Sequence, residues 1–376
     1  MPVSRRNLLY GIATGIISGS ALPVFSSSPY LDKQQTAGKK EPGRPIRLDR
    51  NENPYGPPEG ALAVLRENLG HVNRYPDSAR PLAEKLAHLH NVKPEQIVLG
   101  CGSSEVLRLA VDALLSPGKK LIIASPSYPL AAFYAPMKGA EVVNVPLARD
   151  RSHDLNAMLA QCGPSTGMVC ICNPNNPTGT LTTRHDLEEF LRRLPPSIPV
   201  VIDEAYHHYV VNTPSYVSFI DSPINDNRII TTRTFSKIYA LAGLRIGYAV
   251  ASPEMAARLS PLRIQFGESS LAIPAAMAAL DDAEHVRLCA QSNSDAQQNF
   301  YNQCKLRRLA VSDSHTNFSL IQLDQTVDDV IHHFRKNNIF VSPPFPGTQN
   351  ALRVSMGLPD EMKEFWRVWD MLPAKS

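Results

Sequence analysis

Short apolar runs rich in β-branched residues alternate with amphipathic stretches from Pro94 onward. Helical periodicity fills the gaps between runs, as at residues 104–115 and 184–193. Continuous apolar strands separated by helices are typical of a mainly parallel sheet with helices on both faces. The pattern therefore predicts an α/β fold whose ligands bind outside the carboxyl ends of the strands. The predicted strands are residues 96–99, 120–124, 168–172, 199–202, 228–232 and 246–250.

The pattern changes after about residue 255. Long helical stretches, 254–266 and 273–308, precede two strand candidates at 318–321 and 352–355. Helices segregated from a few strands predict a smaller α+β domain. The expected division is a small-domain N-terminal segment, a large domain and a C-terminal small domain, over residues 46–70, 71–255 and 256–376.

The N-terminus has its own pattern. Residues 1–28 begin with Ser4-Arg5-Arg6-Asn7-Leu8-Leu9, continue with an apolar glycine-rich stretch and end in serines. This order predicts a signal peptide, with residues 29–45 as a linker. Adjacent arginines before leucines resemble the twin-arginine signal, whose export machinery would carry the folded protein to the periplasm. The alternatives are an uncleaved membrane anchor, or a cytoplasmic protein with a basic, apolar N-terminus.

Composition restricts the partners. The chain has 376 residues, 43% of them hydrophobic and 19% charged, which is ordinary for a folded enzyme. The formal net charge is only +3 and the basic residues are interspersed with acids, so we expect no nucleic-acid groove. The six cysteines lack CxxC spacing, so we expect no metal site. Small molecules are the expected partners.

Polar segments follow four of the predicted strands. Lys237 stands in Thr234-Phe235-Ser236-Lys237, and Arg245 follows eight residues later between two glycines. These side chains could combine an amine that forms a Schiff base with a phosphate clamp. A second segment, residues 100–105, joins a strand to a helix, where free amides and two serines could hold phosphate or simply cap the helix.

The other two segments are less specific when each is taken alone. Residues 173–179 (Asn-Pro-Asn-Asn-Pro-Thr-Gly) form a rigid turn. Asp203 ends a buried strand, where a carboxylate could be a helix cap, half of an ion pair or a functional acid.

In this order, the four segments resemble the fold-type I aminotransferases, which use pyridoxal 5'-phosphate (PLP). The resemblance runs from Leu48 to about Pro359. The histidinol-phosphate aminotransferase branch fits best, through Leu-Asp-Arg-Asn-Glu-Asn-Pro at 48–54, Asn-Arg-Tyr-Pro at 73–76 and Leu-Ala-Gly-Leu-Arg at 241–245. The resemblance implies the PLP-dependent transferase fold, with a large α/β domain and a smaller α+β domain.

The resemblance also implies roles for individual residues. Lys237 would form the Schiff base with the cofactor and later act as the base, with Asp203 at the pyridinium nitrogen. Asn176 and Tyr206 would bind the ring 3'-oxygen, and Tyr128 would stack on the ring. The cofactor phosphate would be held by Ser103, Ser104, Ser236 and Arg245. Tyr75 would reach the phosphate in the neighbouring subunit of a homodimer, and Arg353, with Asn176, would bind the substrate carboxylate.

One feature departs from that branch. Its members carry a further arginine for the substrate phosphate, some eleven residues before the position of Arg353. This chain has Ser342 and its neighbours there, without a positive charge. An export signal is also unusual for a step of cytoplasmic histidine synthesis. We therefore expect a substrate without phosphate, and the segment 343–346, with Phe345, would suit an apolar or aromatic side chain.

The expected reaction moves the amino group of an L-amino acid to a 2-oxo acid. Related folds with the same cofactor residues catalyse decarboxylation, epimerisation or cyclisation, and these remain alternatives. A non-catalytic binding protein is a third possibility, against which the intact Lys237 argues.

Overall fold

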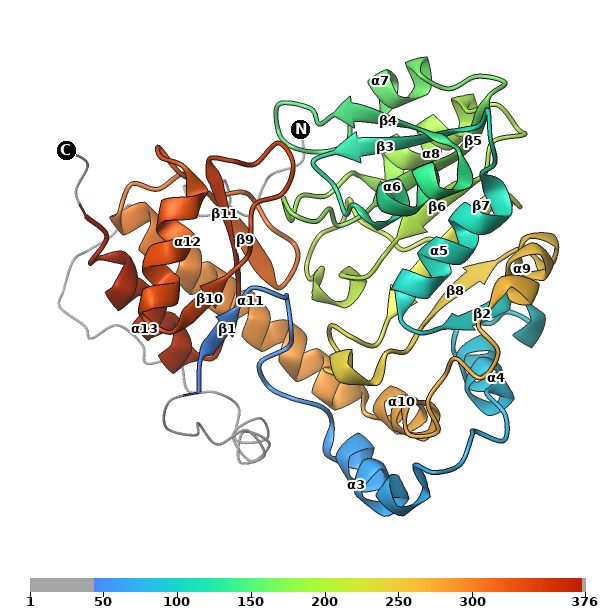
Figure 1. The fold of residues 1–376 in the computed structure, drawn as a ribbon, viewed down its shortest axis with the longest axis horizontal. Coiled ribbons are helices and arrows are strands. Elements are labelled where there is room, and N and C mark those ends of the chain that lie inside the picture. Colours follow the sequence, from blue (N-terminus) through green and yellow to red (C-terminus); the bar gives the residue numbers. More distant parts are fainter. Residues whose placement is uncertain (1–43, 374–376) are drawn as a thin grey trace.

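The computed structural model describes residues 44–373, which form two domains joined along one long helix (Figure 1). The predicted signal peptide, and all but the last two residues of the predicted linker, lie outside this range. Within it, no helix has both the length and the apolar character needed to cross a bilayer.

The large domain is built on a seven-stranded sheet of order β2-β8-β7-β6-β5-β3-β4. All neighbours pair in parallel except β8, which runs antiparallel to both β2 and β7. The strands are β2 (Ile97–Gly100), β3 (Lys120–Ser125), β4 (Glu141–Pro146), β5 (Thr166–Cys172), β6 (Val200–Asp203), β7 (Ile229–Thr234) and β8 (Gly247–Ala251). The predicted mainly parallel sheet is confirmed.

Helices cover both faces of this sheet because successive strand side chains point in opposite directions. In β3, Leu121 and Ile123 pack in one apolar cluster, whereas Ile122 and Ala124 pack in another. The first cluster lies beneath α5 (Ser103–Leu114), α6 (Leu130–Tyr134) and α9 (Pro253–Leu259). The second lies beneath α7 (Leu155–Ala160) and α8 (Arg184–Arg193).

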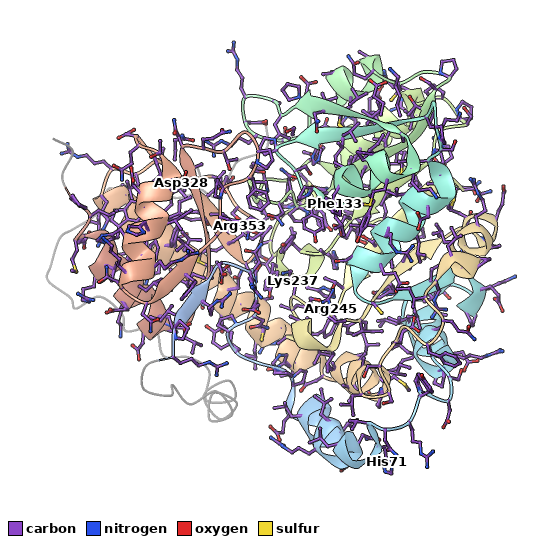
Figure 2. The ribbon with its side chains drawn as sticks, viewed as in Figure 1. His71, Phe133, Lys237, Arg245, Asp328 and Arg353 are labelled. Atoms are coloured by element: carbon purple, nitrogen blue, oxygen red, sulfur yellow. The ribbon has the colours of Figure 1, made fainter. Side chains whose placement is uncertain are left out.

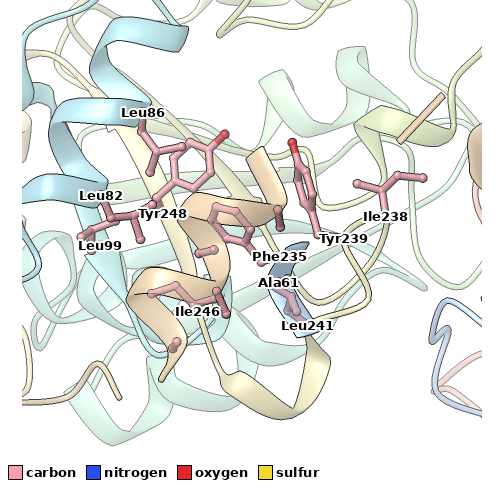
Figure 3. Close-up of a cluster of buried hydrophobic side chains, with 14 of the residues drawn as sticks. Ala61, Leu82, Leu86, Leu99, Phe235, Ile238, Tyr239, Leu241, Ile246 and Tyr248 are labelled. Atoms are coloured by element: carbon pink, nitrogen blue, oxygen red, sulfur yellow. The ribbon is translucent and has the colours of Figure 1, made fainter. Parts of the chain in front are cut away.

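A third apolar cluster supports the segment around Lys237 (Figure 3). Phe235 and Ile238, which flank this lysine in sequence, have 0% and 1% exposure. They pack with residues of α3 (Glu59–Asn68), α4 (Arg80–Leu89) and α10 (Ala272–Asp281). Two buried apolar anchors thus fix the backbone from which Lys237 projects.

The small domain contains two short sheets. Strand β1 (Ile46–Leu48) pairs in parallel with β10 (Ile339–Val341), and β9 (Phe318–Gln322) pairs antiparallel with β11 (Ala351–Ser355). Helices α11 (Ala283–Leu306), α12 (Val327–Lys336) and α13 (Pro359–Trp369) complete it. Helix α11 contributes Cys289 to the cluster near Lys237 and Phe300 to the small-domain core, so it joins the two domains.

The structure differs from two sequence-based expectations. The predicted helix 273–308 is two helices, because Asp282 ends α10 and its carboxylate accepts from the His285 amide to cap α11. The predicted division placed residues 46–70 and α10 with the small domain. Helix α10 instead contacts both α3 and α4, and buried residues of α3 and α10 belong to the Phe235 cluster.

Candidate active site

Functional side chains converge where the parallel strands end, at the junction of the two domains. Lys237 lies between Arg245 and Arg353 in Figure 2. Lys237 follows β7, Arg245 precedes β8 and Arg353 lies in β11 of the small domain. The carboxyl edge of the sheet and the small domain together therefore form the site, as expected for an open α/β sheet.

The Lys237 amine faces two backbone carbonyls and a ring. Its Nζ lies 3.0 Å from the carbonyl oxygens of both Arg50 and Asn51, and 5.7 Å from the Tyr206 ring centroid. Burial, and then the positive charge of Arg353, lower the pKa of Lys237 to about 7. A substantial fraction of this amine is therefore unprotonated near neutral pH, as a nucleophile or base requires.

Asp203 is the last residue of β6 and only 3% exposed. Its Oδ1 accepts from Thr232 Oγ1 at 2.9 Å and from the Ala205 amide at 3.2 Å. Burial raises the pKa of Asp203 to about 6. Because a buried carboxylate is stabilised by a cationic partner, this residue suits a protonated ring nitrogen.

The Tyr206 hydroxyl joins two amides. It accepts from Asn51 Nδ2 at 2.9 Å and from Asn176 Nδ2 at 3.3 Å. Both Tyr206 and Asn176 are buried. With its lone pairs engaged, the hydroxyl can donate its proton to an oxygen placed in the site.

A cradle for an anion lies between the start of α5 and Arg245. The Arg245 guanidinium donates to Ser236 Oγ at 3.2 Å. A side chain at Gly102 would place Cβ 2.4 Å from Arg245 Nη2, and one at Gly247 would place it 2.3 Å from the Ser103 amide nitrogen. The two glycines thus let the guanidinium and the first amide of α5 lie close together, which is the arrangement that holds phosphate.

Ser104 and Tyr128 extend this cradle. A side-chain hydrogen bond joins them, while burial raises the pKa of the Tyr128 phenol. Tyr128 therefore presents a neutral ring beside the helix start.

Arg353 lies between two aromatic rings. Its guanidinium carbon is 5.3 Å from the Phe318 centroid and 4.8 Å from the Phe345 centroid. Nη1 donates to Asn176 Oδ1 and Nη2 to the Asp49 carbonyl, both at 2.7 Å. Nε is buried without a hydrogen-bond partner among the described residues. The side chain therefore has unused donor capacity for a carboxylate.

Tyr75 is not joined to the other predicted residues within one chain. It is 75% exposed, and its ring lies 4.8 Å from that of Phe266. Its predicted role in a neighbouring subunit stays a prediction.

Several residues that contact the site were not assigned roles from the sequence. Asn51 and Asn53 were noticed only as parts of a motif, and Thr232 and Ser355 only as members of predicted strands. Thr232 precedes Lys237 by five residues on a buried strand, and a hydroxyl at such a strand end is the signal that could have revealed it.

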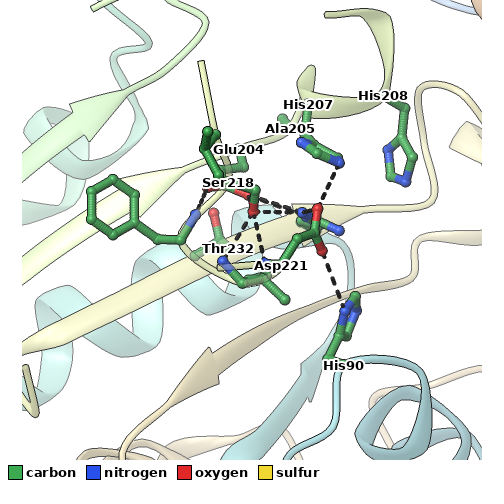
Figure 4. A network of polar contacts seen from close by, with 12 residues as sticks. His90, Glu204, Ala205, His207, His208, Ser218, Asp221 and Thr232 are labelled. Carbon is green, nitrogen blue, oxygen red and sulfur yellow. Dashed lines mark hydrogen bonds and ion pairs between the residues drawn. The ribbon is translucent and has the colours of Figure 1, made fainter. Parts of the chain in front are cut away.

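A buried ion pair involves Glu204, the residue after Asp203, and belongs to the polar network in Figure 4. Arg233 Nη2 lies 3.2 Å from Glu204 Oε2 and 2.9 Å from Asp221 Oδ2, and it donates to Ser218 Oγ at 2.6 Å. The side chains of Arg233 and Glu204 are 4% and 1% exposed. This pair connects the strands that carry Asp203 and Lys237.

We expect Arg233→Met to lower the free energy of unfolding by about 3–5 kcal/mol, because the Glu204 carboxylate would remain buried without its cation. Urea-induced unfolding measures the change. The exposed Arg80–Glu84 pair supplies the control, and Arg80→Met should cost less than about 1 kcal/mol. Equal losses in both variants would contradict this prediction.

Two large cavities lie away from the converging groups. One of about 390 Å³ lies beside α7 and α8, and another of about 490 Å³ lies between residues 76–83 and 260–268. The converging donors and charged groups define the site instead. The Gly102 cradle, the buried Asp203 and the free Arg353 Nε fit PLP and an amino-acid carboxylate.

Known proteins share this architecture. The family described as aminotransferase class I and II matches residues 44–367. Histidinol-phosphate aminotransferase from Caldicellulosiruptor saccharolyticus is 35% identical over 343 residues, covering 90% of this chain and 95% of that protein. The enzyme of that name from Brevibacillus brevis is 37% identical over 321 residues, covering 84% and 87%.

Comparison with solved structures gives the same family resemblance. The histidinol-phosphate aminotransferase of Sinorhizobium meliloti, in complex with pyridoxal-5'-phosphate, superposes with a TM-score of 0.81 at 27% identity, covering 91% of this chain and 94% of that one. The predicted fold type and cofactor are thereby confirmed. The chain belongs to the aminotransferase class I and II family, and it is a PLP-dependent transaminase of fold type I.

Proposed function

We propose that this transaminase takes the amino group from an α-amino acid without a phosphate group and passes it to a 2-oxo acid. The observation that carries the proposal is the environment of Arg353. Its guanidinium is buried at the domain junction, with Nε free for a carboxylate, and Phe345 packs on it at 4.8 Å. The relatives named above act on histidinol phosphate according to their names, so the amino donor is the point to test.

The segment after β10 supports a donor without phosphate. Ser342 is 1% exposed, its amide donates to the Arg353 carbonyl at 3.3 Å and its Oγ donates to the Pro343 carbonyl at 3.0 Å. Residues 342–348 contain neither Lys nor Arg. A phosphate beside Arg353 would therefore meet proline and phenylalanine side chains from this segment instead of a second cation. An apolar or aromatic substrate side chain fits these surroundings better.

When bound, the cofactor supplies a carbonyl group that takes up the amine and a ring that accepts electrons. Lys237 would attach the cofactor and, once its amine is free, take the proton from the substrate Cα. Asp203 would hold the ring nitrogen, and Asn176 and Tyr206 would bind the 3'-oxygen. Ser103, Ser104, Ser236 and Arg245 would hold the phosphate, Tyr128 would stack on the ring, and Arg353 with Asn176 would orient the carboxylate.

We also propose a homodimer in which Tyr75 reaches the site of the partner subunit. Its exposure of 75% and its contact with Phe266, itself 58% exposed, give this surface apolar rings that a second copy could bury. We further propose that residues 1–28 act as a twin-arginine signal for export to the periplasm, a pathway that accepts a protein already folded around its cofactor.

The substrate proposal predicts a specific ranking of amino donors. The purified enzyme, mixed with one donor at a time, should lose the absorbance of lysine-bound PLP with L-phenylalanine or L-leucine and leave it unchanged with L-histidinol phosphate. Phenylalaninol, in which a hydroxymethyl group replaces the carboxylate, is the matched control and should react far more slowly than phenylalanine. Conversion by histidinol phosphate alone would refute the proposal. Release of carbon dioxide without a new oxo acid would support the decarboxylase alternative.

A further inference from the structure

The segment 49–53, which follows β1, presents consecutive backbone carbonyls to both cations of the site. Arg353 Nη2 donates to the Asp49 carbonyl at 2.7 Å, and Lys237 Nζ donates to those of Arg50 and Asn51 at 3.0 Å. At the end of the segment, Asn53 Nδ2 donates at 2.8 Å to the carbonyl of Ile238, the residue after Lys237. One short stretch of backbone therefore contacts both the carboxylate arginine and the lysine.

The direction of these carbonyls depends on an unusual backbone at Asn51. Its φ is 54°, in the left-handed region, which asparagine tolerates better than most residues and β-branched residues hardly adopt. The small domain holds this conformation. The Asn51 amide donates to Ser355 Oγ at 2.8 Å, Ser355 Oγ donates to Asn51 Oδ1 at 2.9 Å, and Asn317 Nδ2 donates to the Asn51 carbonyl at 3.0 Å.

Side-chain hydrogen bonds close a ring around the same groups. Asn51 and Asn176 both donate to the Tyr206 hydroxyl, and Asn176 Oδ1 accepts from Arg353 Nη1. Asn51 is 1% exposed, so water does not compete for these bonds. A displacement of Arg353 is therefore coupled through Asn176 and through segment 49–53 to the acceptors of Lys237.

We propose that Asn51 is a positioning residue for transamination: its left-handed turn aims two carbonyls at the free Lys237 amine and holds that amine beside Arg353. The inference rests on the role of Lys237 proposed above. After Lys237 takes a proton from the substrate Cα, its Nζ is an ammonium group. The two carbonyl oxygens accept from that ammonium group and keep it in place until the proton is delivered.

The charges around Lys237 make the contribution of the carbonyls measurable. Burial and the positive charges of Arg353 and Arg245 disfavour the protonated Lys237 amine. The negative charges of Glu52 and Asp203 favour it. Because the two carbonyls also stabilise the protonated amine, turning them away should lower its pKa further.

The test compares Asn51→Gly with Asn51→Val. Glycine adopts a positive φ without strain, whereas valine strongly disfavours it. The full chain, freed of PLP, is treated with an acetylating reagent between pH 5 and 9, and mass spectrometry follows acetylation of Lys237, with the exposed Lys363 as internal standard. We expect wild type and Asn51→Gly to share a midpoint near the pKa of about 7, and that of Asn51→Val to fall by about one pH unit or more.

The PLP-loaded enzymes provide a second readout. Asn51→Val should lower kcat by about 10- to 100-fold, because Lys237 is misplaced. Its KM for the donor should change less than about threefold, because Arg353 keeps its bond to Asn176. Asn51→Gly keeps the left-handed φ but loses the side-chain bond to Tyr206, so its kcat should fall by a smaller factor than that of Asn51→Val.

Ser355→Ala gives an independent variant if valine prevents folding, since it removes both hydrogen bonds between Ser355 and Asn51. Ser355→Ala should lower the pH midpoint of Lys237 acetylation, as Asn51→Val does. Equal midpoints in all variants, or glycine behaving like valine, would overturn the positioning role. If instead the proposed role of Lys237 were wrong, the result would differ: the absorbance of bound PLP would survive replacement of Lys237 itself.

Discussion

Replacing Lys237 by alanine is expected to abolish the absorbance of lysine-bound PLP and to lower transamination by at least about 10²- to 10⁴-fold. The Lys237 amine is the group whose surroundings keep a substantial unprotonated fraction near neutral pH, through burial and the charge of Arg353. Alanine removes both the attachment point and the base for the substrate Cα proton. Absorbance spectra and oxo-acid formation with the best amino donor measure the two losses.

Lys363→Ala is the matched control, because that side chain is 77% exposed and, within residues 44–373, forms an ion pair only with Asp360. It should leave spectrum and turnover unchanged. Small primary amines added to the Lys237→Ala enzyme should restore part of the turnover by supplying the missing base. A Lys237→Ala variant with a wild-type spectrum would show that the cofactor is attached elsewhere.

Arg353→Gln is expected to lower kcat/KM for carboxylate donors by about 10- to 100-fold, mainly through KM. A charge-assisted hydrogen bond to a carboxylate contributes roughly 1.5–3 kcal/mol, and a neutral amide replaces it poorly. Arg353→Lys should recover only part of the loss, since an ammonium group cannot make the planar double contact. Initial rates with phenylalanine at increasing concentration measure the effect.

Phenylalaninol again serves as the control. Because it has no carboxylate, its slow reaction should be equally slow in wild type and Arg353→Gln. If both donors lose the same factor, the arginine acts by supporting Asn176 and the Asp49 carbonyl instead of by binding substrate. An unchanged KM for phenylalanine in Arg353→Gln would contradict the role of Arg353 in binding the substrate carboxylate.

Strands buried on both faces were predictable from the sequence. The run predicted at 168–172 is β5 (Thr166–Cys172), and all of its residues are buried. Such strands show as continuous apolar runs regardless of their partners. The strands β1, β4 and β10 were not predicted, because two have only three residues and β4 is an edge strand with a single buried residue, Val145.

The site was predictable as far as it follows strand ends. Asp203 ends a buried strand, and Lys237 and Asn176 follow the ends of two others, so their convergence follows from the parallel topology. The contribution of Asn51 was not predictable, because its partner Ser355 lies 304 residues away in sequence. Nothing local shows that the two will meet.

The sequence by itself determined the α/β class and the chemical groups available at the strand ends. It also determined the resemblance of these groups to a PLP site, because periodicity and strand-end residues are local properties. Only the tertiary structure decided that α3 and α10 pack beneath Phe235, that Arg353 lies between two rings, and that the carbonyls of segment 49–53 face Lys237. It also decided the pKa of Lys237. Burial and charge–charge distances set that pKa, and both arise only when residues far apart in the chain pack together.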